Sequence, residues 1–255
     1  MSERKTTALV TGASAGLGVE FCRQLAARCD VIIAVARRGE RLQALAQQLA
    51  GQAEVHPVEA DLTSIEGVAR CMEILRQKGP VDYLVNNAGF STVGDFSDQG
   101  IESQRDMLSL HCDATITLCR AALPFMREQG VGYIINVSSL GALVPGKGLA
   151  TYGATKAFLN YFSLALQAEV AAHGIQVQAL CPGYTRTEFH AGMDEAGFDV
   201  NRIPQEMWMD APAVVSASLA ALAAGQVLVV PGEANQAIAR MGLQQQLDAL
   251  SQGAP

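Results

Sequence analysis

Short apolar segments alternate with longer amphipathic segments along most of the chain. The short segments contain Val, Ile and Leu with little polar alternation, which is typical of strands covered on both faces of a parallel sheet. Seven segments fit this description. We predict strands at Thr7–Val10, Val31–Val35, Val55–Val58, Tyr83–Val85, Tyr133–Val137, Val177–Leu180 and Val227–Val230.

The longer segments place apolar residues at helical spacing. We predict one helix from Leu17 onward and others at Arg41–Leu49, Ile65–Gln77, Gln104–Arg127 and Tyr152–Ala171. Strands and helices that alternate in this way, with no linker between them, indicate a doubly wound α/β fold of the Rossmann type. We expect a single domain over residues 1–255, with a parallel seven-stranded sheet and helices on both faces.

Two segments depart from the alternation. Residues 188–210 mix aromatic and Met side chains with Gly and Pro, and so long a connection in a compact domain is usually functional or mobile. We interpret it as a lid over an apolar substrate; a surface excursion with its own small cluster is the alternative. The candidate substrate contacts are Phe189, Met193, Met207 and Trp208. The Gln-rich tail from about residue 244 is expected to be loose.

The stretch Ala211–Gly232 carries no charge and is therefore tested for a membrane span. Pro, Ser, Gly and Gln residues interrupt it, and it divides into a helix ending near Gly225 and the last predicted strand. We expect no membrane span.

Charge and cysteine content exclude several other classes. A formal net charge of −7 argues against nucleic acid as the main partner. The six cysteines form no C-x-x-C pair and have no metal-ligand spacing with the four histidines, so we expect no metal site. They suit a reducing compartment, and the N-terminus lacks the apolar stretch of a signal peptide. These features predict a cytoplasmic location.

The first predicted strand leads into a glycine-rich turn, Thr11 to Gly18, and then into a helix. Such a turn lets backbone N–H groups approach a phosphate at the helix N-terminus. Gly12 permits the tight turn, Gly16 leaves room beneath a pyrophosphate, and Gly18 lets helix and strand pack closely. A tight turn without a ligand is the alternative; the flanking strand and helix favour the dinucleotide site.

Four motifs in order carry a family resemblance. They are the T-G-x-x-x-G-x-G turn, Asn86-Asn87-Ala88-Gly89, the set Ser139, Tyr152 and Lys156, and Pro182-Gly183-Tyr184-Thr185-Arg186-Thr187. With these motifs the chain resembles the short-chain dehydrogenase/reductase family over roughly Thr7–Val230. The resemblance implies the fold predicted above and a catalytic role for Ser139, Tyr152 and Lys156.

The chemistry of this catalytic set also follows from its spacing. Tyr152 and Lys156 are four residues apart, so their side chains lie on one face of a helix. A nearby ammonium favours the phenolate, which moves a phenol toward acid–base work at neutral pH. Ser139, after a strand, can donate a hydrogen bond to an oxygen that gains negative charge. An exposed helix face is the alternative for Tyr-x-x-x-Lys alone, and no G-x-S-x-G frame supports a Ser nucleophile.

His111 departs from the family pattern, which has Asn at this position in the fourth long helix. In the family that Asn holds a water between the catalytic Lys and solvent. A histidine can hold such a water through a ring nitrogen and adds a group that titrates near pH 6.5. We therefore name His111 as a catalytic candidate in proton relay; a buried histidine that only fills space is the alternative.

The end of the second strand predicts the cofactor. Ala36 stands where an NAD site would have an acid, and Arg37 and Arg38 follow. Arginine forms forked contacts to phosphate, so NADP(H) is favoured, with Ser14 as a neutral partner of the 2′-phosphate. The resemblance adds Asp61 as a contact to the adenine amino group. It also implies cofactor contacts at Leu17, Leu62, Asn87, Ala88, Gly89, Tyr152, Lys156, Pro182, Gly183, Thr185 and Thr187.

These residues together predict an NADP(H)-dependent oxidoreductase that interconverts a carbonyl and a secondary alcohol. Tyr152 would donate the proton, Ser139 would polarise the oxygen, and Lys156 would lower the Tyr pKa and hold the nicotinamide ribose. A non-catalytic NADP-binding regulatory or sensor protein of the same fold is the alternative. A sugar-nucleotide epimerase would need a substrate domain after Val230.

The apolar, Met-rich character of residues 189–209 favours a small-to-medium hydrophobic substrate, because such a wall adapts to varied shapes. Ketones, 3-oxoacyl compounds and steroid-like molecules fit this description. The resemblance further implies a homodimer or homotetramer that associates through the helices at Gln104–Arg127 and Tyr152–Ala171.

Overall fold

The structure is a computed structural model that describes residues 4–191 and 202–252. Its main sheet is parallel, with seven strands in the order β3-β2-β1-β4-β5-β6-β9. They are β1 (Thr7–Thr11), β2 (Val31–Ala36), β3 (Glu54–Glu59), β4 (Tyr83–Asn86), β5 (Gly132–Val137), β6 (Ile175–Leu180) and β9 (Leu228–Val229). The strand order reverses between β1 and β4, and in such sheets ligands bind in the crevice at the carboxyl ends of the strands.

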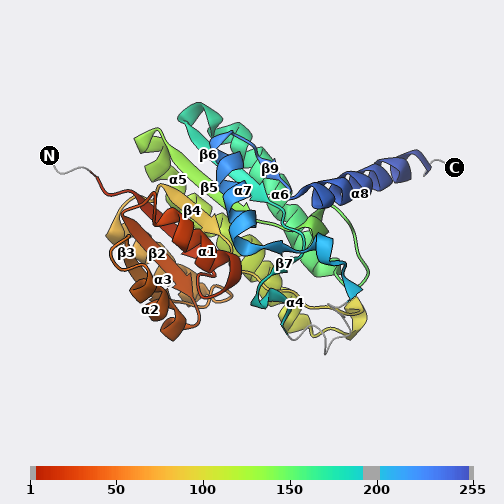
Figure 1. Cartoon of the computed structure of the whole chain (residues 1–255), viewed down its shortest axis with the longest axis horizontal. Helices are drawn as coiled ribbons and strands as arrows, with labels where there is room; N and C mark the ends of the chain where they lie inside the picture. The colour runs from red at the N-terminus through yellow and green to blue at the C-terminus, as the bar shows by residue number, and fades with distance from the viewer. Residues whose placement is uncertain (1–3, 192–201, 253–255) are drawn as a thin grey trace.

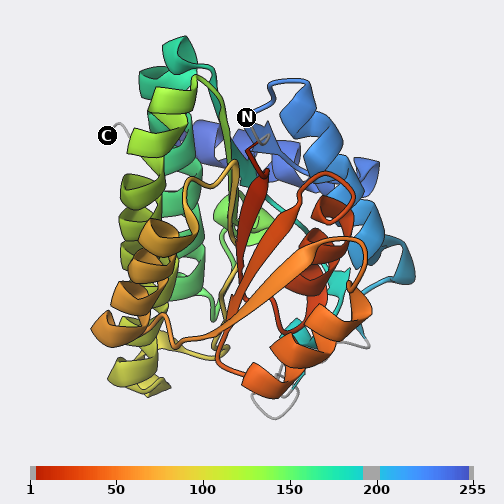
Figure 2. The same cartoon turned by 90° about the vertical axis from the view of Figure 1, so that its left-hand side faces the viewer.

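Helices cover both faces of the sheet, and Figure 2 shows the sheet between the two layers. One layer contains α1 (Gly16–Leu25), α2 (Gly39–Gln48) and α7 (Ala211–Ala223). The other contains α3 (Ile65–Lys78), α4 (Ile101–Leu108), α5 (Ala114–Gln129) and α6 (Ala150–Val170). The predicted doubly wound fold is thereby confirmed, with a strand at each of the seven predicted places.

Successive residues of β1 enter two separate cores. Ala8 and Val10 belong to the core that contains Phe21 of α1. Leu9 belongs to the core that contains Leu118 of α5. Because both faces of the strand are covered, polar alternation is absent from its sequence, which is why short apolar segments predicted the strands.

The predicted helix Gln104–Arg127 is a rod in three parts. After α4 ends at Leu108, residues Ser109–Asp113 form a single π-helical turn, η2, and α5 continues to Gln129. Such turns occur often at functional sites because they shift the side chains of one turn relative to the rest of the helix. His111 lies in the middle of η2 and is buried.

The C-terminal end corrects one expectation. The tail expected to be loose from about residue 244 is helical, because α8 runs from Glu233 to Gln252 (Figure 1). Its Ala, Leu and Gln residues are good helix formers, and Gln246 donates a hydrogen bond to the Leu143 carbonyl at 2.9 Å. The Gln-rich composition concealed this local preference.

The uncharged stretch divides as predicted, into α7 and β9. Within the described part of the chain, no helix combines the length and apolar character needed to cross a membrane.

The two ends of the segment 188–210 lie close together. Thr185–Arg186 (β7) and Met209–Asp210 (β8) pair in parallel and form a separate two-stranded sheet. Among the described residues, the 3₁₀ turn η5 (Glu188–His190) follows β7 and the 3₁₀ turn η8 (Gln205–Met207) precedes β8. The substrate candidate Met193 lies outside the described residues.

Candidate active site

The glycine turn joins β1 to α1 at the strand-order reversal. Gly12 and Gly16 have φ values of 67° and 53°, which side chains other than that of glycine rarely allow. A Cβ atom on Gly18 would overlap the Gly12 carbonyl oxygen, and one on Gly12 would lie 2.7 Å from Asn87 Nδ2. Bare backbone is therefore required at these positions, which is the condition for close approach of a phosphate.

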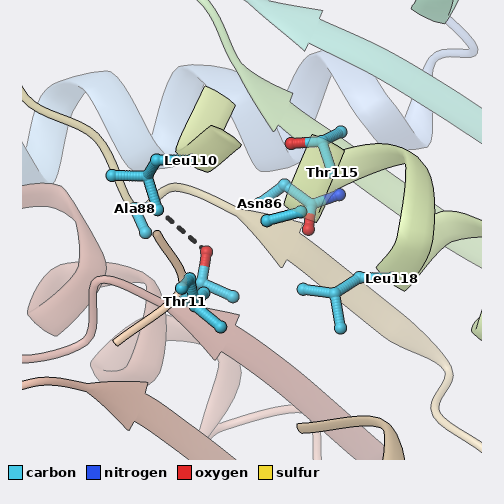
Figure 3. Close-up of a pocket in the computed structure, with 8 residues that line it drawn as sticks. Thr11, Asn86, Ala88, Leu110, Thr115 and Leu118 are labelled. Carbon is cyan, nitrogen blue, oxygen red and sulfur yellow. Dashed lines mark hydrogen bonds between the residues drawn. The ribbon is translucent and has the colours of Figure 1, made fainter. Parts of the chain in front are cut away.

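Hydrogen bonds hold the loop after β4 against this turn. Thr11 Oγ1 accepts from the backbone N–H groups of Asn87 and Ala88, each at 2.9 Å, and the second bond is drawn in Figure 3. Asn87 Nδ2 donates to the Thr11 carbonyl at 2.8 Å. The motif Asn86–Gly89 thus fixes the glycine turn from the neighbouring strand.

A narrow cavity of about 10 Å³ lies behind this junction (Figure 3). Its lining residues come from β1, β4 and the η2–α5 rod, together with Leu62, and are Thr11, Leu62, Asn86, Ala88, Leu110, Ala114, Thr115 and Leu118. The volume matches about one water molecule and excludes a larger ligand. A dinucleotide must therefore bind at a more open surface.

One such surface lies at the ends of β2 and β3. An open cavity of about 460 Å³ is lined by Arg37, Glu59, Ala60, Asp61 and Arg70. Burial raises the pKa of Asp61, but hydrogen bonds from Thr63 and the charge of Arg37 more than offset this, so the pKa is lowered. Asp61 is thus ionised at neutral pH and can accept a hydrogen bond from an amino group.

Arg38 and Ser14 are in direct contact. Arg38 Nε donates to Ser14 Oγ at 3.1 Å, so the arginine lies against the glycine turn. Of the two arginines predicted to contact the phosphate, Arg37 lines the open cavity and Arg38 contacts Ser14.

Ser139, Tyr152 and Lys156 converge at the end of β5 and the start of α6. The Ser139 hydroxyl interacts with the Tyr152 phenol, whose pKa it acts to lower, and it accepts from the Gly141 N–H at 3.1 Å. Lys156 Nζ donates to the Val137 carbonyl at 2.9 Å and lies 5.7 Å from the centre of the Tyr152 ring. The i,i+4 spacing therefore places both side chains on one buried face.

Burial dominates the protonation of this set. It raises the pKa of Tyr152 to about 12, against the opposing hydrogen bond from Ser139. It also lowers the pKa of Lys156 to about 8. Lys156 was expected to lower the pKa of Tyr152; instead desolvation raises it, because Tyr152 is only 8% exposed. Tyr152 is a neutral phenol at pH 7 and thus holds a proton to donate.

His111 lies beside this set with a partner on each ring nitrogen. Nε2 accepts from the Phe90 N–H at 3.2 Å, and Nδ1 is 2.9 Å from Thr155 Oγ1. Burial, and secondarily the charge of Lys156, lowers the pKa of His111 to about 2. A Cβ on Gly89 would lie 2.8 Å from His111 Nε2, so the glycine of the second motif makes room for the ring. The relay role of His111 stays a prediction.

The fourth motif lies across from the glycine turn. The Pro182 carbonyl accepts from the Leu140 N–H at 2.8 Å, and a Cβ on Gly16 would lie 3.0 Å from the Thr187 side chain. Thr185 is buried in β7. A Cβ on Gly183 would overlap the side chain of Asn235 in α8, a neighbour that no sequence pattern indicated.

Aromatic rings form a continuous wall from Tyr152 into the segment 188–210. Phe189 lies 6.1 Å from Tyr152 and 5.4 Å from His190, measured between ring centres. Trp208 lies 5.3 Å from His190 and 5.5 Å from Tyr184. Phe189 and Trp208 are two of the predicted substrate contacts, and their role stays a prediction. Tyr184 and His190 were not named as candidates; their signal was an aromatic residue within the fourth motif and another just after it. Met207 lies in η8 next to Trp208.

Comparison with known proteins decides the family. The sequence profile of the short chain dehydrogenase family matches residues 6–196. The chain belongs to the short-chain dehydrogenases. A probable NADP-dependent dehydrogenase of Haemophilus influenzae is 33% identical over 200 residues, covering 75% of this chain and 78% of the relative.

Two solved structures are similar to nearly the whole chain. One, a short-chain dehydrogenase from Sphingobium yanoikuyae in complex with NADPH, has a TM-score of 0.83 at 34% identity and covers 96% of this chain and 95% of its own. Another is the bulky-bulky ketone specific alcohol dehydrogenase of Comamonas testosteroni, with a TM-score of 0.79 at 29% identity and coverage of 98% and 95%. This short-chain dehydrogenase is therefore an oxidoreductase.

Proposed function

We propose that this protein is an NADP(H)-dependent oxidoreductase that interconverts a bulky hydrophobic ketone and its secondary alcohol. The observation that carries the proposal is the grouping of the buried Tyr152 and Lys156 with the half-buried Ser139, next to the ring of Phe189. The family match and the NADPH complex of the related structure support the reaction type and the cofactor.

The residues present fit a phosphorylated dinucleotide. Bare backbone at Gly12 and Gly18 suits the pyrophosphate, and the open cavity at Arg37 and Asp61 suits the adenosine end. Arg38 with Ser14 supplies a cationic contact for a 2′-phosphate. When bound, NADPH supplies the hydride.

The chain supplies the proton and the electrostatic environment. Tyr152 keeps its proton at neutral pH because burial raises its pKa, so it can donate to the oxygen of a carbonyl that accepts hydride at carbon. Ser139, which acts on the Tyr152 phenol, can donate to the same substrate oxygen. Lys156 places a buried ammonium near the developing negative charge.

The substrate class follows from the wall of Phe189, Trp208 and Tyr184. Rings of this size bury large apolar surfaces, which favours an aryl or polycyclic ketone over a small charged one. The specificity of the Comamonas testosteroni relative for bulky-bulky ketones supports the same choice. 3-Oxoacyl and steroid-like substrates belong in the same panel.

The test is NADPH oxidation at 340 nm with ketones graded from acetone to diaryl ketones. We expect turnover to rise with substrate bulk and to be lost in Tyr152→Phe. NADPH binding without turnover of any carbonyl, in the wild type, would instead support the NADP-binding regulatory or sensor protein.

Self-association and location belong to the same proposal. Exposed apolar residues occur along the rod and α6, namely Ile101, Leu108, Ile116, Tyr161 and Leu164, and a partner copy would cover them. We expect a homodimer or homotetramer, which light scattering after gel filtration measures. Six free cysteines support residence in the cytoplasm.

A further inference from the structure

Glu188, at the start of the segment 188–210, forms ion pairs with two arginines that follow β2 in the sequence. Its carboxylate accepts from Arg41 Nη1 at 2.7 Å through both oxygens and from Arg38 Nη1 at 3.0 Å. Glu188 begins η5 directly after the fourth motif, some 150 residues from Arg38 in the sequence. The contact is therefore a product of the fold and has no local sequence signal.

Arg38 is shared between this carboxylate and the glycine turn. While Nη1 contacts Glu188, Nε donates to Ser14 Oγ at 3.1 Å. Arg38 and Ser14 are the groups that suit a 2′-phosphate, so Glu188 is an anion already placed on one of them. Hydrogen bonds from Arg41 and Arg38 lower the pKa of Glu188, which keeps the carboxylate ionised at neutral pH.

Two anions cannot both hold the same guanidinium at short range without repelling each other. A phosphate monoester carries more charge than a carboxylate and has three acceptor oxygens. Such a phosphate is therefore the stronger ligand of the two, and it competes with Glu188 for the guanidinium of Arg38.

We propose that Glu188 is a cofactor-specificity residue whose carboxylate competes with the 2′-phosphate of NADP(H) for Arg38 and Arg41. The proposal rests on the NADP(H) dependence proposed above. NAD(H), which lacks this phosphate, binds without displacing the carboxylate and gains nothing from the two arginines. By this competition Glu188 reduces the preference for NADP(H) over NAD(H) that the two arginines would otherwise give.

The competition also links the cofactor to the substrate wall. Phe189, the next residue, lies 6.1 Å from the Tyr152 ring, and His190 lies 5.3 Å from Trp208. Release of Glu188 frees the turn η5 that carries both rings. A substrate that binds better when η5 is released must then tighten NADP(H) binding. By linkage, NADP(H) tightens the binding of that substrate by the same factor.

The first experiment compares the dissociation constants of NADPH and NADH for the wild type and Glu188→Gln by fluorescence titration at low salt. We expect NADPH to bind about three- to ten-fold tighter to Glu188→Gln, because exposed ion pairs are individually weak. We expect NADH to change less than about two-fold, since a neutral amide removes only the competition for the 2′-phosphate.

Glu40→Gln is the matched control. Glu40 is an exposed acid in the first turn of α2, and its replacement removes the same charge near Arg38 and Arg41 without touching Glu188. If Glu40→Gln tightened NADPH binding equally, the effect of Glu188→Gln would be one of general electrostatics, and the proposal would be overturned. Weaker NADPH binding by Glu188→Gln would also overturn it, because Glu188 would then be a clasp over the bound cofactor.

A second readout uses Trp208, the single tryptophan of the chain. Titration with 2′-phospho-ADP-ribose is expected to change Trp208 emission in the wild type, while ADP-ribose leaves it within error. An equal response to both ligands would contradict displacement by the 2′-phosphate.

The failure of the competition and the failure of the cofactor proposal give different results. If the wild type binds NADPH and NADH equally and Arg38→Ala changes neither, the NADP(H) preference itself is wrong. If the wild type prefers NADPH and Arg38→Ala removes the preference, but Glu188→Gln changes nothing, only the competition is wrong.

Discussion

His111 Nδ1 lies 2.9 Å from Thr155 Oγ1, and that hydroxyl donates in turn to the Tyr152 carbonyl at 2.8 Å. The Phe90 N–H donates to Nε2 of the same ring, which assigns the proton to Nδ1. The imidazole therefore connects the loop after β4 to the turn of α6 that carries Tyr152. Through these bonds His111 can position the catalytic turn while staying neutral.

We expect His111→Asn to lower kcat about three- to ten-fold and to leave the shape of the pH–rate profile between pH 5 and 8 unchanged. The lower kcat follows from the loss of one of two hydrogen bonds, each worth about 1 kcal/mol. The unchanged profile follows from the pKa of His111, which burial lowers to about 2.

Thr155→Val is the companion variant, because it removes the hydroxyl that His111 contacts. If His111 acts through Thr155, the double variant is no worse than the more impaired single variant. A pH–rate profile that shifts by a full pH unit in His111→Asn would instead support titration of the histidine in a proton relay.

Tyr152→Phe removes the proton donor and keeps the ring. We expect kcat for ketone reduction to fall by about 10²- to 10⁴-fold, the usual contribution of a positioned acid. The dissociation constant of NADPH is expected to stay within about two-fold. Tyr161→Phe is the matched control on the same helix, because Tyr161 is 77% exposed. A Tyr152→Phe variant with near-normal turnover would exclude Tyr152 as the donor.

The fold was predictable from the sequence wherever a residue pattern is compatible with only one local structure. Runs such as Val31–Val35 are apolar on both faces, so only a covered strand suits them, and the glycine turn at Gly12 requires bare backbone. The helix α8 was missed because Gln and Ala give weak periodicity. Its contact with the fourth motif, through Asn235 and Gly183, has no counterpart in local sequence.

The candidate site, too, was predictable only in part. Tyr152 and Lys156 share one helix, so their spacing predicts their common face. Glu188 lies far from Arg38 and Arg41 in the sequence, and only the tertiary fold brings them into contact. The pKa of Tyr152 could not be predicted for a related reason, because the burial that raises it is a property of the assembled site.

Lys156 makes the free energy of unfolding depend on pH. Its pKa is lowered from 10.5 to about 8 by burial, so between these values the unfolded chain binds more protons than the folded one. Stability then rises with pH from about 8 to 10.5, by up to about 3 kcal/mol for this group alone. Urea unfolding at pH 7.5, 8.5 and 9.5 measures the rise.

Lys156→Met is the control for this prediction, because it keeps the buried stem and removes the titrating group. We expect the rise between pH 8 and 10 to be absent from this variant. An equal rise in both proteins would assign the effect to other groups.

Gly18→Ala tests the close packing of the glycine turn. A Cβ at this position would overlap the Gly12 carbonyl, and it would lie 2.7 Å from Asn87 Nδ2. We expect destabilisation of about 1–3 kcal/mol by overpacking, and a loss of NADPH binding of at least about ten-fold. Gly100→Ala is the control, because the nearest atom to its added Cβ is 3.9 Å away. Normal NADPH binding by Gly18→Ala would show that the turn tolerates a side chain.

Phe189→Ala tests the aromatic wall as the source of substrate selection. The Phe189 ring is 37% exposed and faces Tyr152 at 6.1 Å, so a ketone at Tyr152 can bury its apolar groups against it. Removing the ring is expected to raise KM for aryl ketones about ten-fold, since an aromatic contact of this kind is worth about 1 kcal/mol beyond its buried area. Cyclohexanone and smaller ketones are expected to change less than about two-fold, because they do not reach the wall. Phe96→Ala, at a 61% exposed position in another loop, controls for general loss of aromatic surface. An equal loss of activity for large and small ketones would mean that Phe189 supports Tyr152 and does not select the substrate.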